Sequence, residues 1–464
     1  MQKRFQVLTI TLLLSVAGSF TPNDKVSVPT SFEGRLSAFM QFTSARLADA
    51  AKPWRRPPKA TVFFPASTPA SVRPMLTWSK VRGAVMYEFE LLPYNLPFLD
   101  KDSLSPTRLF STRQIYNSGF NPDLTTYIGK APLFWRVRAL NFDGEPISSF
   151  STPVPIYIDP ELEPVSAPLP TAFFNAYNGS TLLYPVYSWL PISRAVQYEV
   201  ELLDDAPENP GGTAPSQHRI WSAVTSLSDK YDDYPRISQK PFYWRVRGLD
   251  EKGEAVGVYS DAVSFVNDPD KGWQIATYGD SISHGGGNLS YSPADWEYSY
   301  QTYLNFPTVN LSNSGDTSSS CLERFDSDVL PFRPRYLIIL EGTNSIRGGA
   351  SAAEVASDLK ALRDKCLKNN IRPIFLTLPP INPDSISKVF GEETAPNWRE
   401  EMDSLNEFIR TLPHIDIASL FNYPDGIMPP ALSLDGLHPD ITAKRKMAEL
   451  INSKFPELIR TLPQ

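Results

Sequence analysis

Residues 277–287, TYGDSISHGGG, place a serine that could act as a nucleophile, Ser281, directly after an apolar run. A serine hydroxyl is a weak nucleophile at neutral pH and needs a nearby imidazole to take its proton. That imidazole in turn needs a carboxylate to hold its tautomer. The stretch is not a phosphate-binding loop, because it matches neither the G-x-x-x-x-G-K-[ST] nor the G-x-G-x-x-G pattern. It also lacks the G-x-S-x-G motif of α/β-hydrolases.

The chain contains four histidines that could supply the base. His218 lies in a β-rich part of the chain, and His414 opens a strand at its amino end, so both are expected far from Ser281. His438, in LDGLHPD, follows the last predicted strand, and Asp435 precedes it by three residues. This spacing lets the carboxylate reach Nδ1 of the imidazole. The sequence therefore predicts Ser281 as nucleophile, His438 as base and Asp435 as its orienting carboxylate.

Ester or amide hydrolysis through a tetrahedral intermediate also needs donors aimed at the developing oxyanion. The candidates are the backbone N–H of Ser281, the backbone N–H of Gly315 in NSGD and the side-chain amide of Asn344 in GTNS. Gly315 and Asn344 could instead be ordinary turn residues. Further residues near the nucleophile are expected around the substrate pocket: Asp280, His284 and Trp296. Of these, Trp296 could also be a core residue of a helix.

These residues need a scaffold that brings distant loops together, and the pattern of residues 270–464 provides one. Apolar runs at 273–278, 308–311, 336–340, 371–378 and 415–420 alternate with helices expected at 293–304, 351–369, 396–411 and 439–455. This alternation predicts a parallel sheet of five strands with helices on both faces. Ligands bind at the carboxyl ends of the strands in such sheets, which is where the loops with the candidate residues lie.

Four blocks of residues 272–464 resemble, in order and spacing, those of the SGNH/GDSL hydrolases. They are YGDSIS with Ser281, NSGDTS with Gly315, EGTNS with Asn344, and DGLHP with Asp435 and His438. The resemblance implies a flavodoxin-like sheet and ester hydrolysis without a metal or an organic cofactor. Two features depart from the family's pattern. Ser345 stands where the third block usually has aspartate, and HGGGNLSYSP follows the nucleophile where a helix normally starts. We expect this insertion to shape the substrate pocket.

The first half of the chain contains an internal duplication. LTWSKVRGAVMYEFELL (76–92) is repeated as YSWLPISRAVQYEVELL (187–203), and PLFWRVRALNFDGEPISSFSTP (132–153) as PFYWRVRGLDEKGEAVGVYSDA (241–262). The copies are about 110 residues apart, which indicates two copies of one domain rather than a solenoid. Alternating polar and apolar residues predict half-buried antiparallel strands, and the number of short strands favours β-sandwiches.

Both copies resemble fibronectin type III domains. The resemblance places the first at residues 59–158 and the second at 171–268, with a stiff Pro-rich linker at 159–170. Their role could be to bind sugars or a protein partner, or to act as spacers. Residues 20–58 have no assignment beyond a helix expected at 37–52.

Composition and the first residues indicate where the protein works. A net charge of −7 argues against binding to nucleic acid or to anionic membranes. Residues 1–19 combine Lys3 and Arg4 with an apolar core and small residues, which predicts a secretory signal peptide and an exported protein in the periplasm or medium. No later stretch is apolar enough for a membrane span. The two cysteines, Cys321 and Cys366, could form a disulfide or remain buried thiols, and a metal site is not expected.

An exported hydrolase with two added β-domains is expected to act on a polymer outside the cytoplasm. Proteins similar in layout are often carbohydrate esterases, so the resemblance predicts an O-acetylesterase that acts on an acylated polysaccharide through an acyl-enzyme. A lipase or thioesterase and a glycan O-acetyltransferase on the same site are alternatives. A surface-binding protein with a degenerate hydrolase domain is a further one, against which the intact Ser281, Asp435 and His438 argue.

Overall fold

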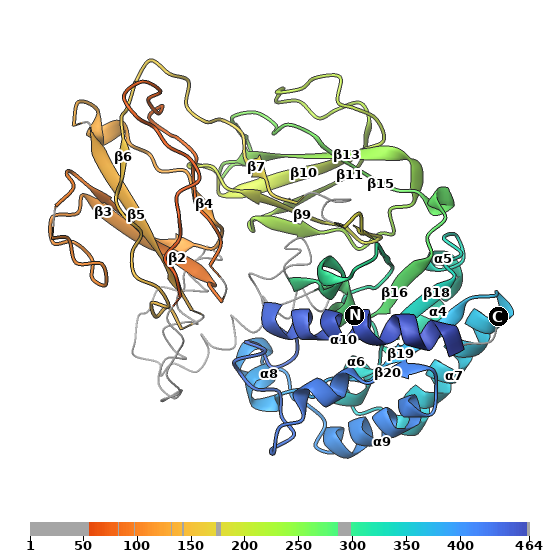
Figure 1. The fold of residues 1–464 in the computed structure, drawn as a ribbon. Helices are drawn as coiled ribbons and strands as arrows, with labels where there is room; N and C mark the ends of the chain where they lie inside the picture. Colours follow the sequence, from red (N-terminus) through yellow and green to blue (C-terminus); the bar gives the residue numbers. More distant parts are fainter. Residues whose placement is uncertain are drawn as a thin grey trace, which may run out of the picture.

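The structure is a computed structural model that describes residues 55–81, 83–96, 98–130, 132–141, 143–172, 178–285 and 298–461. It has two β-rich regions, called here the first and second repeat, and an α/β region formed by the C-terminal part of the chain (Figure 1). The signal peptide predicted at 1–19 and the helix predicted at 37–52 lie outside the described residues. The expectation that the first half of the chain is built of strands is confirmed.

The first repeat contains β1 (Leu76–Thr77), β2 (Met86–Leu92), β3 (Phe110–Ile115), β4 (Gly119–Phe120), β5 (Leu133–Leu140) and β6 (Val154–Ile156), with the 3-10 helix η1 (Thr125–Tyr127). Strands β3-β2-β5-β6 form an antiparallel sheet, and β1 pairs with β4. The two tryptophans shared by the repeats, here Trp78 and Trp135, lie in its core with ring centroids 6.1 Å apart.

The second repeat contains β7 (Leu169–Pro170), β9 (Val186–Leu190), β10 (Gln197–Leu203), β11 (Arg219–Thr225), β12 (Asp229–Tyr231), β13 (Ser238–Leu249), β14 (Ala255–Val256) and β15 (Val263–Asn267). One sheet has the order β11-β10-β13-β14 with β15 on β13, and another has the order β12-β9-β7. The second repeat thus places its corresponding tryptophans, Trp189 and Trp244, in one core between two sheets.

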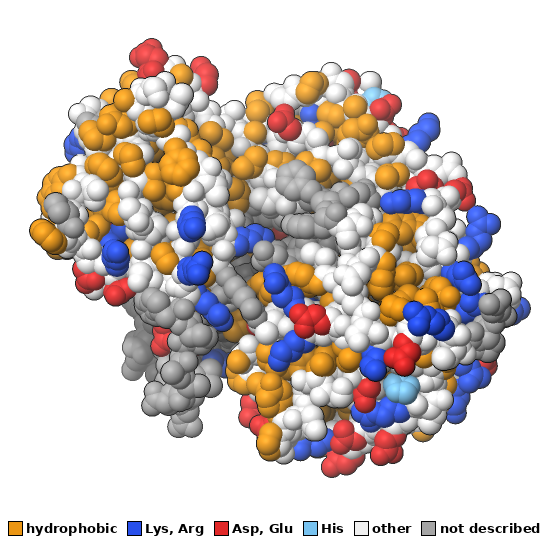
Figure 2. Space-filling model, in the orientation of Figure 1, with side chains coloured by type: hydrophobic (Ala, Val, Ile, Leu, Met, Phe, Trp, Pro, Cys, Tyr) orange, Lys and Arg blue, Asp and Glu red, His pale blue; other side chains and the backbone are white. Residues whose placement is uncertain are grey.

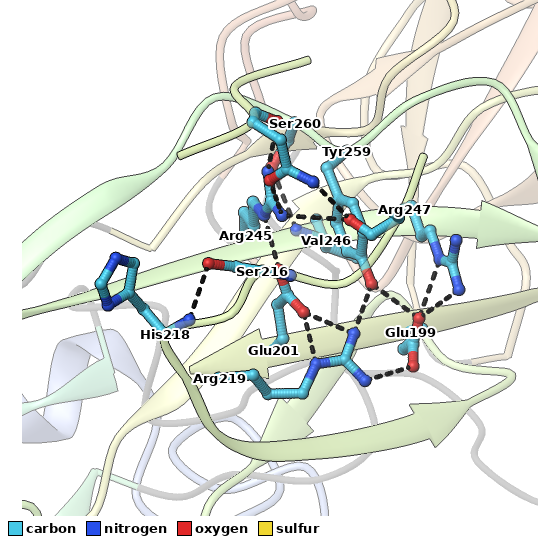
Figure 3. A network of polar contacts seen from close by, with 12 residues as sticks. Glu199, Glu201, Ser216, His218, Arg219, Arg245, Val246, Arg247, Tyr259 and Ser260 are labelled. Carbon is cyan, nitrogen blue, oxygen red and sulfur yellow. Dashed lines mark hydrogen bonds and ion pairs between the residues drawn. The ribbon is translucent and has the colours of Figure 1, made fainter. Parts of the chain in front are cut away.

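The first repeat buries the charged side chains of its paired Glu-x-Glu and Arg-x-Arg strands, and the second buries Glu201 and Arg245 while Glu199 and Arg247 are partly buried. In the second repeat Arg245 donates to Glu201 at 2.6 Å and to the backbone and side chain of Asn209 at 3.0 and 2.8 Å (Figure 3). In the first repeat Arg136 donates to Glu90 in the same way, at 2.6 Å. Each arginine holds a loop of its own repeat over the sheet, so these residues are almost wholly buried rather than on the half-exposed face that the sequence predicted.

The α/β region contains β16 (Ile275–Gly279), β17 (Val309–Asn310), β18 (Tyr336–Leu340), β19 (Arg372–Leu376) and β20 (His414–Ile415). Four of the predicted runs contain most or all of a strand, the fifth overlaps β20 by one residue, and these strands are parallel, but the sheet has six strands, in the order β20-β19-β18-β16-β17-β8. The sixth strand, β8 (Thr181–Leu182), comes from the second repeat and pairs with β17. The predicted five-stranded sheet is therefore one strand short, because a two-residue strand leaves no periodic signal in the sequence.

The helices of the α/β region are α3 (Ser281–His284), α4 (Ser318–Glu323), α5 (Phe325–Asp328), α6 (Thr343–Arg347), α7 (Ala352–Lys368), α8 (Pro383–Phe390), α9 (Trp398–Arg410) and α10 (Ile441–Thr461), with the 3-10 helices η2 (Pro269–Lys271), η4 (Tyr300–Tyr303) and η5 (Ile417–Phe421). The predicted helices at 351–369 and 396–411 match α7 and α9 closely. The apolar run 415–420 is mostly η5 rather than strand, and α8 was not predicted.

The second repeat is joined to the α/β region by more than the β8–β17 pair. The hydroxyl of Tyr184 donates to Asp328 at 2.5 Å, and that of Tyr231 donates to Asn313 at 2.5 Å. The side-chain amide of Asn178 donates to the carbonyls of three residues between 301 and 306. These contacts make the second repeat part of the edge of the α/β sheet.

The helices, the surface charge and the cysteines add three further observations. None of its described helices has the length and apolar composition that a bilayer crossing requires. Figure 2 shows acidic and basic side chains interspersed over the α/β region, without one large patch of either sign on the face in view. Both cysteines, Cys321 and Cys366, are buried free thiols, which resolves the alternative that the sequence left open.

Candidate active site

The nucleophile candidate lies at the start of α3, directly after β16. The strand ends at Gly279, whose φ is 149° and where a Cβ would lie 1.9 Å from the backbone oxygen of Leu340 on the neighbouring strand. Only glycine fits this close approach. Asp280 then caps α3 by accepting the N–H of Ile282 at 2.8 Å. The turn therefore places Ser281 as the first helical residue, at the carboxyl end of a central strand.

Ser281, His438 and Asp435 form a continuous hydrogen-bonded chain. The Oγ of Ser281 lies 2.7 Å from Nε2 of His438, and Nδ1 of His438 lies 2.8 Å from Oδ2 of Asp435. The other carboxylate oxygen of Asp435 accepts the backbone N–H groups of Leu437 and His438 at 2.9 and 2.8 Å. These bonds fix the carboxylate, so that Nδ1 donates to it and Nε2 is left to accept the proton of the serine hydroxyl.

The electrostatic setting keeps this carboxylate charged. Burial raises the pKa of Asp435, but the charge of His438 and the hydrogen bonds that the carboxylate accepts outweigh it, so its pKa lies below the usual value. Asp435 is 1% exposed, whereas Ser281 and His438 are 8% and 9% exposed. The side chains of Ser281 and His438 thus keep a small exposed surface, whereas the orienting carboxylate is almost fully enclosed.

The oxyanion-hole candidates Gly315 and Asn344 lie in the segments that follow adjacent strands, because β17 and β18 flank β16. Gly315 has a φ of 90°, which favours glycine. The side-chain amide of Asn344 donates to the carbonyl of Asp316 at 2.8 Å, which links the third block to the second. Ser345, where the family usually has aspartate, accepts the N–H of Ser318 at 2.9 Å and so adds a second link to the start of α4.

The three pocket candidates have different outcomes. Asp280 and His284 are buried, at 1% and 0% exposed. His284 bonds to the hydroxyl of Ser314 and the carbonyl of Tyr184, each at 2.8 Å, and packs edge-on against Tyr231. Burial lowers the pKa of His284 to about 4 and raises that of Asp280 to about 6. Trp296 lies outside the described residues.

Sequence analysis missed Lys444, which lies behind the nucleophile. Its side chain on α10 is 0% exposed, and its ammonium group donates to the carbonyl of Ile282, next to Ser281. Burial lowers the pKa of Lys444 to about 7, although the carboxylates of Asp280 and Asp435 act in the opposite direction. A signal was present: this lysine stands on the apolar face of its helix, at helical spacing from other buried residues, namely Ile441, Ala448, Ile451 and Phe455.

Asp316, Cys321 and Glu341 place one potential metal-ligand atom each within 4.8 Å of one another. The carboxylate of Asp316 is already paired with Arg324 and accepts the hydroxyl of Ser320 at 3.0 Å. Burial raises the pKa of the Cys321 thiol and, together with neighbouring carboxylates, the pKa of Glu341 well above their usual values. Two neutral groups and one paired carboxylate do not fit a divalent cation, which binds charged, deprotonated ligands.

Comparison with known proteins identifies the α/β region. Residues 277–445 match the family model of the GDSL-like lipase/acylhydrolases. A search of curated proteins gives no significant match.

Similar solved structures include a lipase/acylhydrolase from Enterococcus faecalis, which is 22% identical over 41% of this chain and 98% of that chain, with a TM-score of 0.33. A GDSL-like lipase from Bacteroides thetaiotaomicron is 19% identical over 40% and 88%, with a TM-score of 0.32. A variant of an acetyl-xylooligosaccharide esterase from Geobacillus is 19% identical over 39% and 92%, with a TM-score of 0.31. On the family match, residues 277–445 form a GDSL-like lipase/acylhydrolase domain, and the protein is an ester-bond hydrolase.

Proposed function

We propose that the protein removes short acyl groups, foremost acetyl, from a polysaccharide, with Ser281 as nucleophile, His438 as general base and Asp435 as the residue that orients it. The observation that carries this proposal is the unbroken chain of hydrogen bonds from Ser281 to His438 at 2.7 Å and from His438 to Asp435 at 2.8 Å. The first distance is one at which His438 can take the proton of the serine hydroxyl, and the second is that of a charge-assisted hydrogen bond that orients the imidazole.

In the acylation step, Oγ of Ser281 attacks the ester carbonyl while its proton passes to Nε2 of His438. Asp435 stabilises the imidazolium ion that forms. The oxyanion of the tetrahedral intermediate accepts hydrogen bonds from the backbone N–H groups of Ser281 and Gly315 and from the amide of Asn344. Collapse of the intermediate releases the sugar hydroxyl, which takes the proton back from His438.

In the deacylation step, water attacks the acyl-enzyme and His438 takes the proton of that water. The second tetrahedral intermediate breaks down to the free acid, and the proton returns to Ser281. No further group is needed, because these side chains supply the nucleophile, the base and the oxyanion donors.

The limited exposure of the reacting groups supports a short acyl chain. Ser281 and His438 are each less than a tenth exposed, so little of either side chain is open to an incoming ester. The proposal also includes a polymeric substrate met after export, with residues 1–19 as the signal peptide. In it the two repeats, at 59–158 and 171–268, are fibronectin type III-like modules. Their duplicated Trp and Glu/Arg strand pattern supports this assignment.

The test is acetate release from acetylated xylan and from nitrophenyl acetate by the wild type and by Ser281→Ala. We expect Ser281→Ala to lose about four orders of magnitude in kcat or more, because the nucleophile acts as a unit with its base. Ser283→Ala, in the same helix, is the control and should lose less than about tenfold. Undiminished release by Ser281→Ala would exclude this serine from the mechanism.

The same assay separates the alternatives. Preference for C8–C16 esters over acetate would indicate a lipase or thioesterase. Transfer of the acetyl group to an added glycan in place of water would indicate an O-acetyltransferase. Failure of a reactive phosphonate to label Ser281 would indicate a binding protein.

A further inference from the structure

The first repeat packs against the hydrolase domain beside the general base. The contact is an apolar cluster, called here the docking cluster, whose buried members are Val85, Met86 and Leu140 of the repeat and Tyr298, Val389 and Ile441 of the α/β region. Phe390 and Leu434 are partly buried and pack against it. At its edge Asp143 of the repeat lies 3.8 Å from Lys388 of α8. The ends of β2 and β5 therefore cover the C-terminal end of α8 and the start of α10.

Phe390 connects the docking cluster to the catalytic chain. Its ring lies edge-on to the imidazole of His438, with centroids 6.2 Å apart and an interplanar angle of 79°. Phe390 is also the last residue of α8, where the helix gives no further support on its C-terminal side. A path of side-chain contact thus runs from the first repeat through Phe390 to His438, and from there to Ser281.

The second repeat provides an internal comparison, because the corresponding residues are known from the duplicated sequence. Val85 and Met86 correspond to Val196 and Gln197. Val85 is 3% exposed, whereas Val196 is 46% exposed. Met86 is buried, and Gln197 is polar and exposed. Leu140 corresponds to Leu249, which is also buried, at 5% exposed. The burial of the positions of Val85 and Met86 is therefore what distinguishes the first repeat from the second.

We propose that the first repeat positions the general base: Val85, Met86 and Leu140 hold Phe390 against His438 and so keep its imidazole in line with Ser281. Phe390 is a positioning residue, since it acts on the base and not on the substrate. Closely packed interiors transmit small displacements, and an error of about 1 Å in a reacting group costs up to about a hundredfold in rate. The inference rests on the proposed function, because it requires His438 to be the base.

The experiment measures kcat and KM for nitrophenyl acetate, together with thermal unfolding. Met86→Ala and Phe390→Ala are each expected to lower kcat about tenfold while KM stays within about twofold, because the substrate site itself is intact. The double variant should be no slower than Phe390→Ala, since both changes act through one ring. Phe390→Tyr keeps the ring and should restore kcat to within about twofold of the wild type. Val196→Ala, the matched control in the second repeat, should behave as the wild type.

A second variant guards against misfolding. Met86→Gln introduces the residue that the second repeat has at the same position, so the repeat should fold while its contact with the hydrolase domain weakens. Three results would each overturn the inference. The first is a wild-type kcat in a folded Met86→Gln variant, and the second is a double variant in which the losses of kcat caused by Met86→Ala and Phe390→Ala multiply. The third is a loss of kcat that only follows the fraction of folded protein. If Ser281→Ala hydrolyses the ester as fast as the wild type, the proposed function fails instead. This result distinguishes failure of the proposed function from failure of the inference about the first repeat.

Discussion

Replacing Lys444 by methionine should stabilise the protein at neutral pH and change how its stability depends on pH. The side chain is 0% exposed, and burial lowers its pKa from 10.5 to about 7. In the unfolded chain the lysine holds its proton up to about pH 10.5, so between pH 7 and 10.5 the unfolded state binds more protons than the folded state. Stability therefore rises with pH in this window, and the destabilisation is complete below pH 7.

The magnitude follows from the two pKa values. At pH 7 the buried lysine lowers the free energy of unfolding by about 4 kcal/mol relative to a group that does not titrate. Methionine leaves the carbonyl of Ile282 without its donor, which costs about 1–2 kcal/mol. Lys444→Met should thus be more stable than the wild type by about 2–3 kcal/mol at pH 7. At pH 9.5 the wild type should have recovered about 3 kcal/mol of the difference, so that the two are nearly equal.

Urea titrations at pH 7, 8 and 9.5 measure this difference, with tryptophan fluorescence as the signal. Lys446→Met is the matched control, because Lys446 lies two residues further along the same helix and is exposed. It should leave stability unchanged within about 0.5 kcal/mol at each pH. A difference between the wild type and Lys444→Met that is the same at pH 7 and 9.5 would refute the reasoning, because it would mean that Lys444 does not titrate in this window.

Two further predictions concern the catalytic chain and its scaffold. The loss of kcat in Asp435→Ala should be at least about tenfold smaller than the loss in His438→Ala, because the imidazole remains when its orienting carboxylate is removed. Steady-state kinetics with nitrophenyl acetate measure both losses, and equal losses would contradict the assigned roles. Gly279→Ala should destabilise the protein by about 3 kcal/mol or more, since the new Cβ would overlap the carbonyl of Leu340 and the backbone has a positive φ. Thermal unfolding measures this change in stability. A change below about 1 kcal/mol would be inconsistent with the close approach of the two strands.

The sequence could place the candidate residues at one edge of the sheet because their positions follow from topology. Alternating apolar runs and helices allow only a parallel sheet, and the carboxyl ends of its strands meet at one edge. The predicted run at 336–340 is β18 itself, and the short helices α3 and α6, which follow β16 and β18, carry Ser281 and Asn344. Residues far apart in the chain could therefore be expected together, and the structure brings Ser281, His438 and Asp435 into one hydrogen-bonded chain.

What could not be predicted depends on contacts between regions. Lys444 stands on the apolar face of α10, but its bond to the carbonyl of Ile282 could not be predicted, and His284 is buried by groups of the second repeat. The paired strands of the repeats alternate polar and apolar residues, which indicates one exposed face. Loops that no local pattern specifies cover that face and bury Arg136 and Arg245. In each case the burial comes from a segment distant in sequence.

The β8 strand has a consequence for biosynthesis. Ser180, beside β8, bonds to Thr308, beside β17, and these residues are 128 positions apart. A ribosome that adds about 5–20 residues per second needs roughly 6–26 s to make the chain between them. Throughout that interval the residues that become the outermost strand of the hydrolase sheet have no strand to pair with, although Asn267 of the second repeat can already bond to both of them. An unpaired strand edge is prone to misassociation, so the nascent second repeat must tolerate a delay that ends only when the hydrolase sequence emerges.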